Sequence, residues 1–228
     1  MNYDLLKEEE KILKSDFMKY FEHSISMHKL IKEMYKSDFS NEKKCEEFVE
    51  EVNSLETKSN HIHAILLEDA VWFISKETPK ANHLRFVIGI INSIFDLERI
   101  CDHAQRIALF KARNKTVSIF MKETVVELEN NIENFSNKIY EALLNFKVMN
   151  VYNQCIKDSE DFFLNYKNKL YSIYNEIDSM DKSKNGTLID FVTVLKNLDR
   201  TVDHFRNILE NFVFINNPDF FVRNKKID

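Results

Sequence analysis

The sequence predicts an all-α protein built from six long helices. Hydrophobic residues make up 44% of the 228 residues, which is enough for a substantial core, yet the chain contains only two glycines and two prolines. Sandwiches, barrels and doubly wound folds need many tight turns, which use these two residues heavily. Apolar residues instead recur every three or four positions over long stretches. We therefore expect long helices joined by few connections.

The first half of the chain contains three of the expected helices. The first spans residues 5–36, with apolar positions in helical spacing from Phe17 onward. Ser40 is the expected N-cap of the second helix, because its hydroxyl can accept a hydrogen bond from a free first-turn amide. The second helix ends before Pro79, since the residue before proline avoids the helical conformation. The third helix is expected over residues 80–111.

The second half contains three more helices after a break. The basic and polar segment 112–116 forms the break, and the fourth helix follows over residues 117–146. The fifth and sixth helices are expected over residues 151–180 and 188–214. Pro218 and the asparagines before it stop the last helix, because this sequence favours a turn.

Three helices, a break and three further helices predict two similar three-helix bundles. We place the first bundle at residues 1–113, the second at residues 114–217 and a basic tail at residues 218–228. Such a tail is expected to be mobile.

One segment of the third helix recurs in the sixth helix. Residues 97–107 read Leu-Glu-Arg-Ile-Cys-Asp-His-Ala-Gln-Arg-Ile, and residues 198–208 read Leu-Asp-Arg-Thr-Val-Asp-His-Phe-Arg-Asn-Ile. Both copies share a leucine, an acid, an arginine, an Asp-His pair and an isoleucine at the same spacing. Since each copy lies in the last helix of its half, the repeat indicates two pseudo-symmetric halves.

Each copy places two carboxylates four residues apart, beside the apolar stripe. The pairs are Glu98 with Asp102, and Asp199 with Asp203. Like charges at this spacing destabilise a helix by about 0.2–0.5 kcal/mol, so each pair needs solvent, a salt bridge or a cation. A solvated surface pair is the alternative, but the repetition favours a cation. Hard cations prefer oxygen ligands of this kind.

A metal site in a bundle also needs ligands from a second helix. The second helix offers Glu56 and Asn60, and the fifth helix offers Asp161 and Asn165. His63 lies beside the first set and is as readily explained as an ordinary partly buried histidine. We therefore predict a metal site in each half, formed by these four residues and the two carboxylate pairs.

The arginines and histidines of the repeat are expected to stabilise the fold rather than to bind a ligand. Arg99 and Arg200 are expected to form salt bridges to neighbouring helices. His103 and His204 are rotated off the carboxylate face by about one helical step. We expect these histidines to form structural hydrogen bonds.

The repeated segment resembles a motif of the PhoU family. That motif reads Asp-Leu-Glu-Arg-Ile-Gly-Asp-His-Ala-x-x-Ile-Ala, and residues 96–108 match it closely, with Cys101 in place of the glycine. Residues 79–85 resemble the Pro-x-x-x-x-Leu-Arg sequence that precedes it in the family. The second copy departs further, because Asp199 replaces the glutamate and Thr-Val replaces Ile-Gly.

The resemblance extends to the helices that carry the other predicted ligands. Glu56, Asn60 and His63 fall without gaps on the family's Asp-xxx-Asn/Asp-xx-Glu positions. Asp161 and Asn165 match only when a one-residue shift is allowed. The asparagines and the histidine are departures that weaken the expected ligand sets.

The resemblance implies both a fold and a function. It implies a pseudo-symmetric pair of three-helix bundles with surface clusters of divalent or trivalent metal ions, usually iron or zinc. The resemblance also implies a cytoplasmic negative regulator of phosphate uptake. Its implied partners are the ATPase subunit of a phosphate ABC transporter and, where one exists, a sensor histidine kinase.

Composition excludes several other classes of function. The formal net charge is −5 and acidic residues are interspersed with basic ones, so we expect no nucleic-acid partner. The longest apolar run is about half the ~20 residues that a membrane span requires, so we expect no membrane insertion. Three dispersed cysteines and a charged start to the sequence predict reduced thiols in the cytoplasm. Peripheral association with a membrane transporter and homodimer formation stay open.

Two alternative functions compete with the regulator. One is an accessory or adaptor bundle for another permease, with acidic pairs that bind nothing. The other is a di-metal enzyme, which requires Glu-x-x-His on two helices. The acids and histidines of the repeat have a different spacing, and no nucleophile elbow, P-loop or HExxH motif is present. We therefore do not expect an enzyme.

Overall fold

The computed structural model describes residues 3–37, 42–114, 117–145, 147–179 and 185–220. Within these ranges the chain forms helices and no strand, which confirms the predicted all-α class. The helices are α1 (Tyr3–Lys36), α2 (Glu42–Glu77), α3 (Asn82–Arg113), α4 (Ile119–Leu144), α5 (Val148–Ser179) and α6 (Asn185–Asn216). Both α5 and α6 begin before their predicted first residue, because periodicity marks apolar positions rather than helix ends. Ser40, the expected N-cap, and the end of the tail lie outside the described residues.

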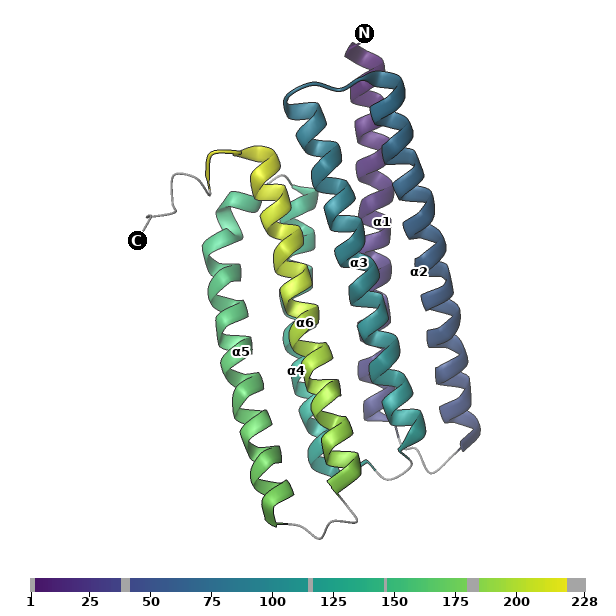
Figure 1. The fold of residues 1–228 in the computed structure, drawn as a ribbon, viewed down its shortest axis with the longest axis vertical. Helices are drawn as coiled ribbons and strands as arrows, with labels where there is room; N and C mark the ends of the chain where they lie inside the picture. The colour runs from purple at the N-terminus through teal and green to yellow at the C-terminus, as the bar shows by residue number, and fades with distance from the viewer. Residues whose placement is uncertain (1–2, 38–41, 115–116, 146, 180–184, 221–228) are drawn as a thin grey trace.

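The six helices form two three-helix units that lie side by side (Figure 1). Helices α1, α2 and α3 pack on one another, and so do α4, α5 and α6. The units meet along two lines, α3 against α6 and α1 against α4. Among the described helices, α2 touches only α1 and α3, and α5 touches only α4 and α6. The outer helices α2 and α5 therefore form opposite edges of the molecule.

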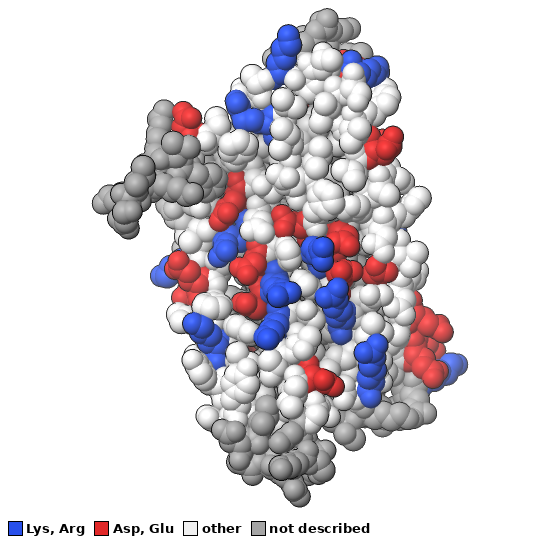
Figure 2. All heavy atoms as spheres, in the orientation of Figure 1, with Lys and Arg blue, Asp and Glu red and all other residues white. Residues whose placement is uncertain are grey.

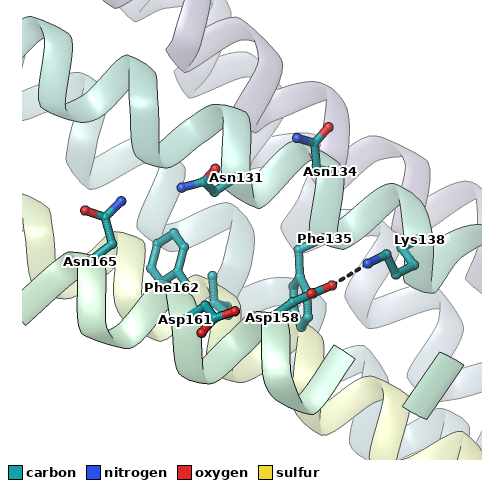
Figure 3. A pocket seen from close by; sticks show the side chains of 9 residues that line it. Asn131, Asn134, Phe135, Lys138, Asp158, Asp161, Phe162 and Asn165 are labelled. Atoms are coloured by element: carbon teal, nitrogen blue, oxygen red, sulfur yellow. Dashed lines mark hydrogen bonds and ion pairs between the residues drawn. The ribbon is translucent and has the colours of Figure 1, made fainter. Parts of the chain in front are cut away.

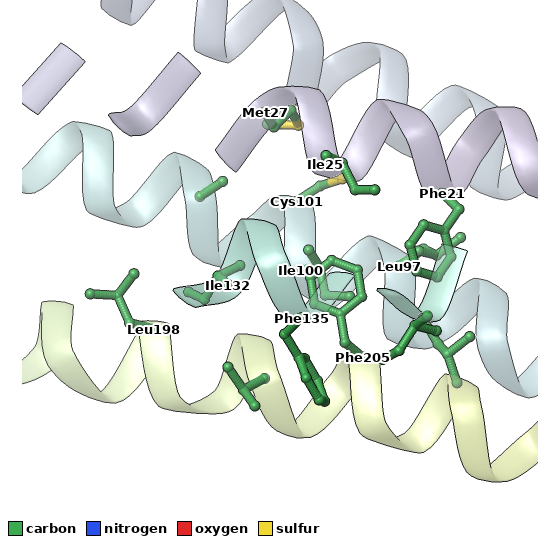
Figure 4. Packing of buried hydrophobic residues seen from close by; sticks show 14 of the residues in the cluster. Phe21, Ile25, Met27, Leu97, Ile100, Cys101, Ile132, Phe135, Leu198 and Phe205 are labelled. Atoms are coloured by element: carbon green, nitrogen blue, oxygen red, sulfur yellow. The ribbon is translucent and has the colours of Figure 1, made fainter. Parts of the chain in front are cut away.

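The hydrophobic interior is continuous across both units. Figure 4 shows Phe21 of α1, Ile100 of α3, Phe135 of α4 and Phe205 of α6 packed together. The rings of Phe21 and Phe205 lie 5.3 Å apart between centroids, which joins the first unit to the second. The two units therefore share one core, and the chain crosses from one to the other between α3 and α4.

One of the two glycines lies where α3 and α6 approach closely. A Cβ atom on Gly89 would lie 2.5 Å from Cδ1 of Ile215 on α6. The missing side chain therefore provides space for Ile215.

None of the described helices combines the length and apolarity that a membrane span needs.

The shared core predicts a large effect of truncation at its centre. Phe205 is fully buried, so Phe205→Ala should lower the free energy of unfolding by about 3–5 kcal/mol through lost burial and cavity formation. Ile189→Ala on the same helix is the control, because Ile189 is 57% exposed and should change stability by about 0.5 kcal/mol or less. Urea unfolding followed by circular dichroism measures both. Equal losses would contradict a core shared through α6.

Candidate functional site

The first set of predicted ligands lies level on α2 and α3. Gln105 donates a hydrogen bond of 2.9 Å to Asn53, and the rings of His63 and Phe95 lie 4.9 Å apart between centroids. These two contacts fix the register of the antiparallel pair. The stretch between them contains all four ligands predicted for the first half, with one pair from each helix: Glu56, Asn60, Glu98 and Asp102.

The three carboxylates of this set lie near a buried thiol. Burial raises the pKa of Cys101 to about 12, and the charges of Glu98, Asp102 and Glu56 add smaller contributions in the same direction. A hydrogen bond from the neighbouring Ser59 acts in the opposite direction. The carboxylates therefore lie close enough to influence one thiol. The structure brings the first predicted set together on one face.

These side chains are nevertheless engaged with partners on their own helices. Asn60 donates a hydrogen bond to Glu56, and Nη2 of Arg106 lies 3.3 Å from Oδ2 of Asp102. In the described part of the chain, no three His, Cys, Asp or Glu side chains are arranged so that they could hold a metal ion. The donor chemistry suits a hard cation, but the side chains do not converge on a common point.

The second set is divided between two cavities. Asp161 and Asn165 line a cavity of about 330 Å³ between α4 and α5, shown in Figure 3. There, Asn165 donates a hydrogen bond of 2.8 Å to Glu127 of α4. Lys138 of α4 forms an ion pair with Asp158 in the same cavity. Asp161 and Asn165 thus line a cavity on the side of α5 that faces α4.

The carboxylates of α6 line a separate cavity of about 220 Å³ between α5 and α6. Asp199 and Asp203 lie there with Glu160, the residue before Asp161. The structure therefore places Glu160, rather than Asp161, with the carboxylates of the repeat. In the sequence, Asp161 matched the family motif only after a shift of one residue. That mismatch was the signal that could have pointed to the neighbouring Glu160.

The carboxylates in this α5–α6 cavity repel one another. Burial raises the pKa of Asp199 to about 6, and repulsion from Asp203 contributes next. Arg206 and Arg200 partly offset this rise. Nη2 of Arg206 lies 3.3 Å from Asp203, while its Nε lies 3.7 Å from Oε1 of Glu210, so the arginine is shared between two carboxylates. The carboxylates of this cavity are thus only partly neutralised.

The arginine and histidine predictions had mixed outcomes. Arg99 pairs at 3.5 Å with Glu98, its neighbour on the same helix, so the prediction of a bridge to another helix was wrong for Arg99. His204 forms a 2.8 Å hydrogen bond with Asp96 across the α3–α6 contact, as expected of a structural residue. His103 is buried, yet neither ring nitrogen has a hydrogen-bond partner among the described residues. The expected structural hydrogen bond of His103 was therefore wrong.

Sequence reasoning missed a buried polar pair between α1 and α4. Nδ1 of His28 lies 3.0 Å from Oε2 of Glu129, and both side chains are almost completely buried. Nε2 of His28 lies 3.3 Å from the carbonyl oxygen of Ile100 on α3. The pair therefore connects three helices in the interior. The residues are 101 positions apart in sequence, so only the tertiary structure reveals them.

The fold and these surfaces define a class: duplicated three-helix-bundle proteins with a group of surface carboxylates in each half. The PhoU domain family model matches residues 17–110, which includes the first copy of the repeat. The uncharacterized protein MG409 of Mycoplasma genitalium is 32% identical to this chain over 97% of the chain and 98% of the relative. The chain belongs to the PhoU family.

Other relatives agree with this assignment. A phosphate-specific transport system accessory protein PhoU homolog of Clostridium acetobutylicum is 24% identical, over 90% of this chain and 94% of the relative. The crystal structure of the phosphate transport system regulatory protein PhoU from Streptococcus pneumoniae has a TM-score of 0.80 at 18% identity, covering 93% of this chain and 97% of that chain. That structural likeness supports the shared fold.

The buried His103 predicts a pH dependence of stability. Burial, followed by the nearby His204, His28, Arg106 and Arg200, lowers the pKa of His103 from 6.5 to about 3. Because the folded state favours the neutral ring, this contribution to stability is complete above pH 6.5. It is lost as the pH falls from 6.5 towards 3.

The measurement compares wild type with His103→Gln in urea unfolding between pH 7 and pH 5. Wild type should lose up to about 1.4 kcal/mol more per pH unit in the lower part of this range, the limit for one proton. Asp199 acts in the opposite sense, because its raised pKa favours the folded state as the pH falls, but it is common to both proteins. Parallel pH profiles would contradict the assignment to His103.

Proposed function

We propose that this protein is a negative regulator of phosphate uptake that acts through the ATPase subunit of a phosphate ABC transporter. PhoU proteins are accessory and regulatory proteins of phosphate transport, and membership in the family is the observation that supports the proposal most. In organisms with a matching sensor histidine kinase, the same protein would also report to that kinase. No chemical reaction is assigned to it.

The surface offers a place for such contacts. Figure 2 shows acidic and basic side chains gathered in a belt across the middle of the face formed by α2, α3, α5 and α6. The carboxylate groups of both halves contribute to this face. A belt of mixed charge favours electrostatic complementarity with a partner and can steer its approach. Because the units share one core, a partner that binds one half also restrains the other.

Metal binding stays a prediction, and the first half is the better candidate. There the two carboxylates of α3 and Glu56 of α2 lie on one face. Two of these carboxylates already accept hydrogen bonds, Glu56 from Asn60 and Asp102 from Arg106. In the second half, the predicted ligands line two different cavities. Among the described residues, neither half forms a ready metal site, so metal binding is tested separately from the partner.

Elemental analysis of protein purified without chelators tests the metal prediction. If the first-half carboxylates bind iron or zinc, Glu98→Ala with Asp102→Ala should lower the metal content with the fold retained. The double variant should also relieve repression of phosphate uptake in cells. The matched control is Glu123→Ala with Asp190→Ala, because both acids are exposed and lie on other helices, α4 and α6. Unchanged metal content in the first variant would remove the metal hypothesis.

The partner is tested separately by a pulldown with the purified transporter ATPase subunit. Retention of the subunit by the wild-type protein, and relief of uptake repression when the gene is deleted, are the expected results. Absence of both would leave an accessory role at another permease as the better description.

A further inference from the structure

Helix α5 carries a second apolar stripe that faces solvent. Its inner stripe packs into the core through residues such as Phe162, Tyr166 and Ile173. On the outer side, four large apolar residues are exposed: Phe163 at 41%, Leu164 at 58%, Tyr171 at 64% and Tyr174 at 46%. A helix that packs on only one side needs one apolar stripe.

The outer residues have the spacing of a helix-packing surface. At 100° per residue, Phe163, Leu164, Tyr171 and Tyr174 lie within an arc of about 100°, together with Glu160 and Lys167. The stripe runs for about 20 Å along the helix. Because α5 touches only α4 and α6 among the described helices and lies at an edge of the molecule, this face has no neighbour (Figure 1).

The opposite edge helix provides an internal comparison. Helix α2 exposes Ile65, Val71 and Trp72, of which only Trp72 is aromatic, with the exposed Glu68 among them in sequence. The Lys76 ammonium group lies 4.1 Å from the centre of the Trp72 ring. The pseudo-symmetric counterpart thus lacks the dense aromatic stripe of α5, so the stripe is not a general property of edge helices in this fold.

The α5 stripe ends beside the acidic cavity between α5 and α6. Glu160 belongs to the stripe and also lines that cavity with Asp199, Asp203 and Phe163. The Lys167 ammonium group lies 4.5 Å from the centre of the Phe163 ring. The ring thus already contacts one cation. The surface is therefore largely apolar, with Lys167 within it, and one end carries three carboxylates against the single cation Arg206.

We propose that the outer face of α5 is a docking surface for an amphipathic helix of a partner protein, whose basic end meets the cavity formed by Glu160, Asp199 and Asp203. The partner would place apolar side chains at i, i+3 or i+4, and i+7 against the stripe, the usual spacing of helix recognition. Exposed tyrosines suit such an interface, because they bury a large ring and keep a hydroxyl in contact with water. This proposal does not depend on the role in phosphate uptake.

Charge distinguishes this occupant from a second copy of the chain and from a lipid surface. A two-fold pairing centred on the stripe would bring Lys167 of one copy against Lys167 of the other, which is unfavourable. An anionic membrane attracts helices with a basic polar face, whereas this stripe ends in carboxylates. A partner with lysine or arginine beside its apolar residues satisfies both features.

The test measures binding of a labelled synthetic helical peptide by fluorescence anisotropy. The peptide carries leucines at i, i+3 and i+7 and two arginines at one end. Leu164→Ser with Tyr171→Ser should weaken binding about tenfold or more, and Glu160→Gln should weaken it less and reduce its salt dependence. The matched control, Ile65→Ser with Trp72→Ser, should stay within about twofold, since it removes similarly exposed residues from α2.

Further measurements test the occupant and the integrity of the fold. A peptide with glutamates in place of the arginines should bind more weakly if the acidic cavity takes part. Circular dichroism should show unchanged helix content in all variants, because the substituted side chains are exposed. Absence of saturable peptide binding, an equal loss in the α2 control, self-association that the Tyr171 variant abolishes, or binding to phosphatidylglycerol vesicles would each overturn the proposal.

Discussion

The packing of α3 against α6 is the constraint on which the rest of the structure depends. The two copies of the repeated segment lie on these helices, and their apolar stripes face the shared interior. Gly89 leaves room for Ile215 at this contact, and His204 bonds to Asp96 across it. Because this contact and the α1–α4 contact are the only ones between the units among the described helices, neither unit buries its apolar face without the other.

Polar groups buried between the two units make their packing specific but costly. The buried His28–Glu129 pair requires each partner to be present, since an unpaired buried charge is strongly destabilising. His103 adds a buried ring without hydrogen-bond partners among the described residues, and such a group costs about 1–3 kcal/mol. The histidine of the repeated Asp-His pair thus has different surroundings in the two halves. The duplication preserved the residue type, while the two contacts diverged.

The same packing explains where the carboxylates lie. Residues beside the apolar stripe of α3 or α6 must emerge next to the neighbouring outer helix, so Glu98 and Asp102 meet α2, and Asp199 and Asp203 meet α5. In the first half this brings all the predicted residues to one face. In the second half the opposing residue is Glu160, and α5 adds an exposed aromatic stripe that α2 lacks. The two halves therefore present different surfaces from one architecture.

The sequence by itself determined the helical class, the order of the six helices and the internal repeat, because periodicity and scarce turn residues are local properties. It also predicted that the carboxylates of α3 lie level with Glu56 and Asn60 of α2, although their role as ligands stays a prediction. It could not determine how α5 is rotated about its axis. An error of one residue corresponds to about 100° of rotation, and in the structure Asp161 and Asn165 lie on the side of α5 that faces α4. Only the tertiary structure decided that placement, the His28–Glu129 pair and the single shared core, because each depends on contacts between residues far apart in the chain.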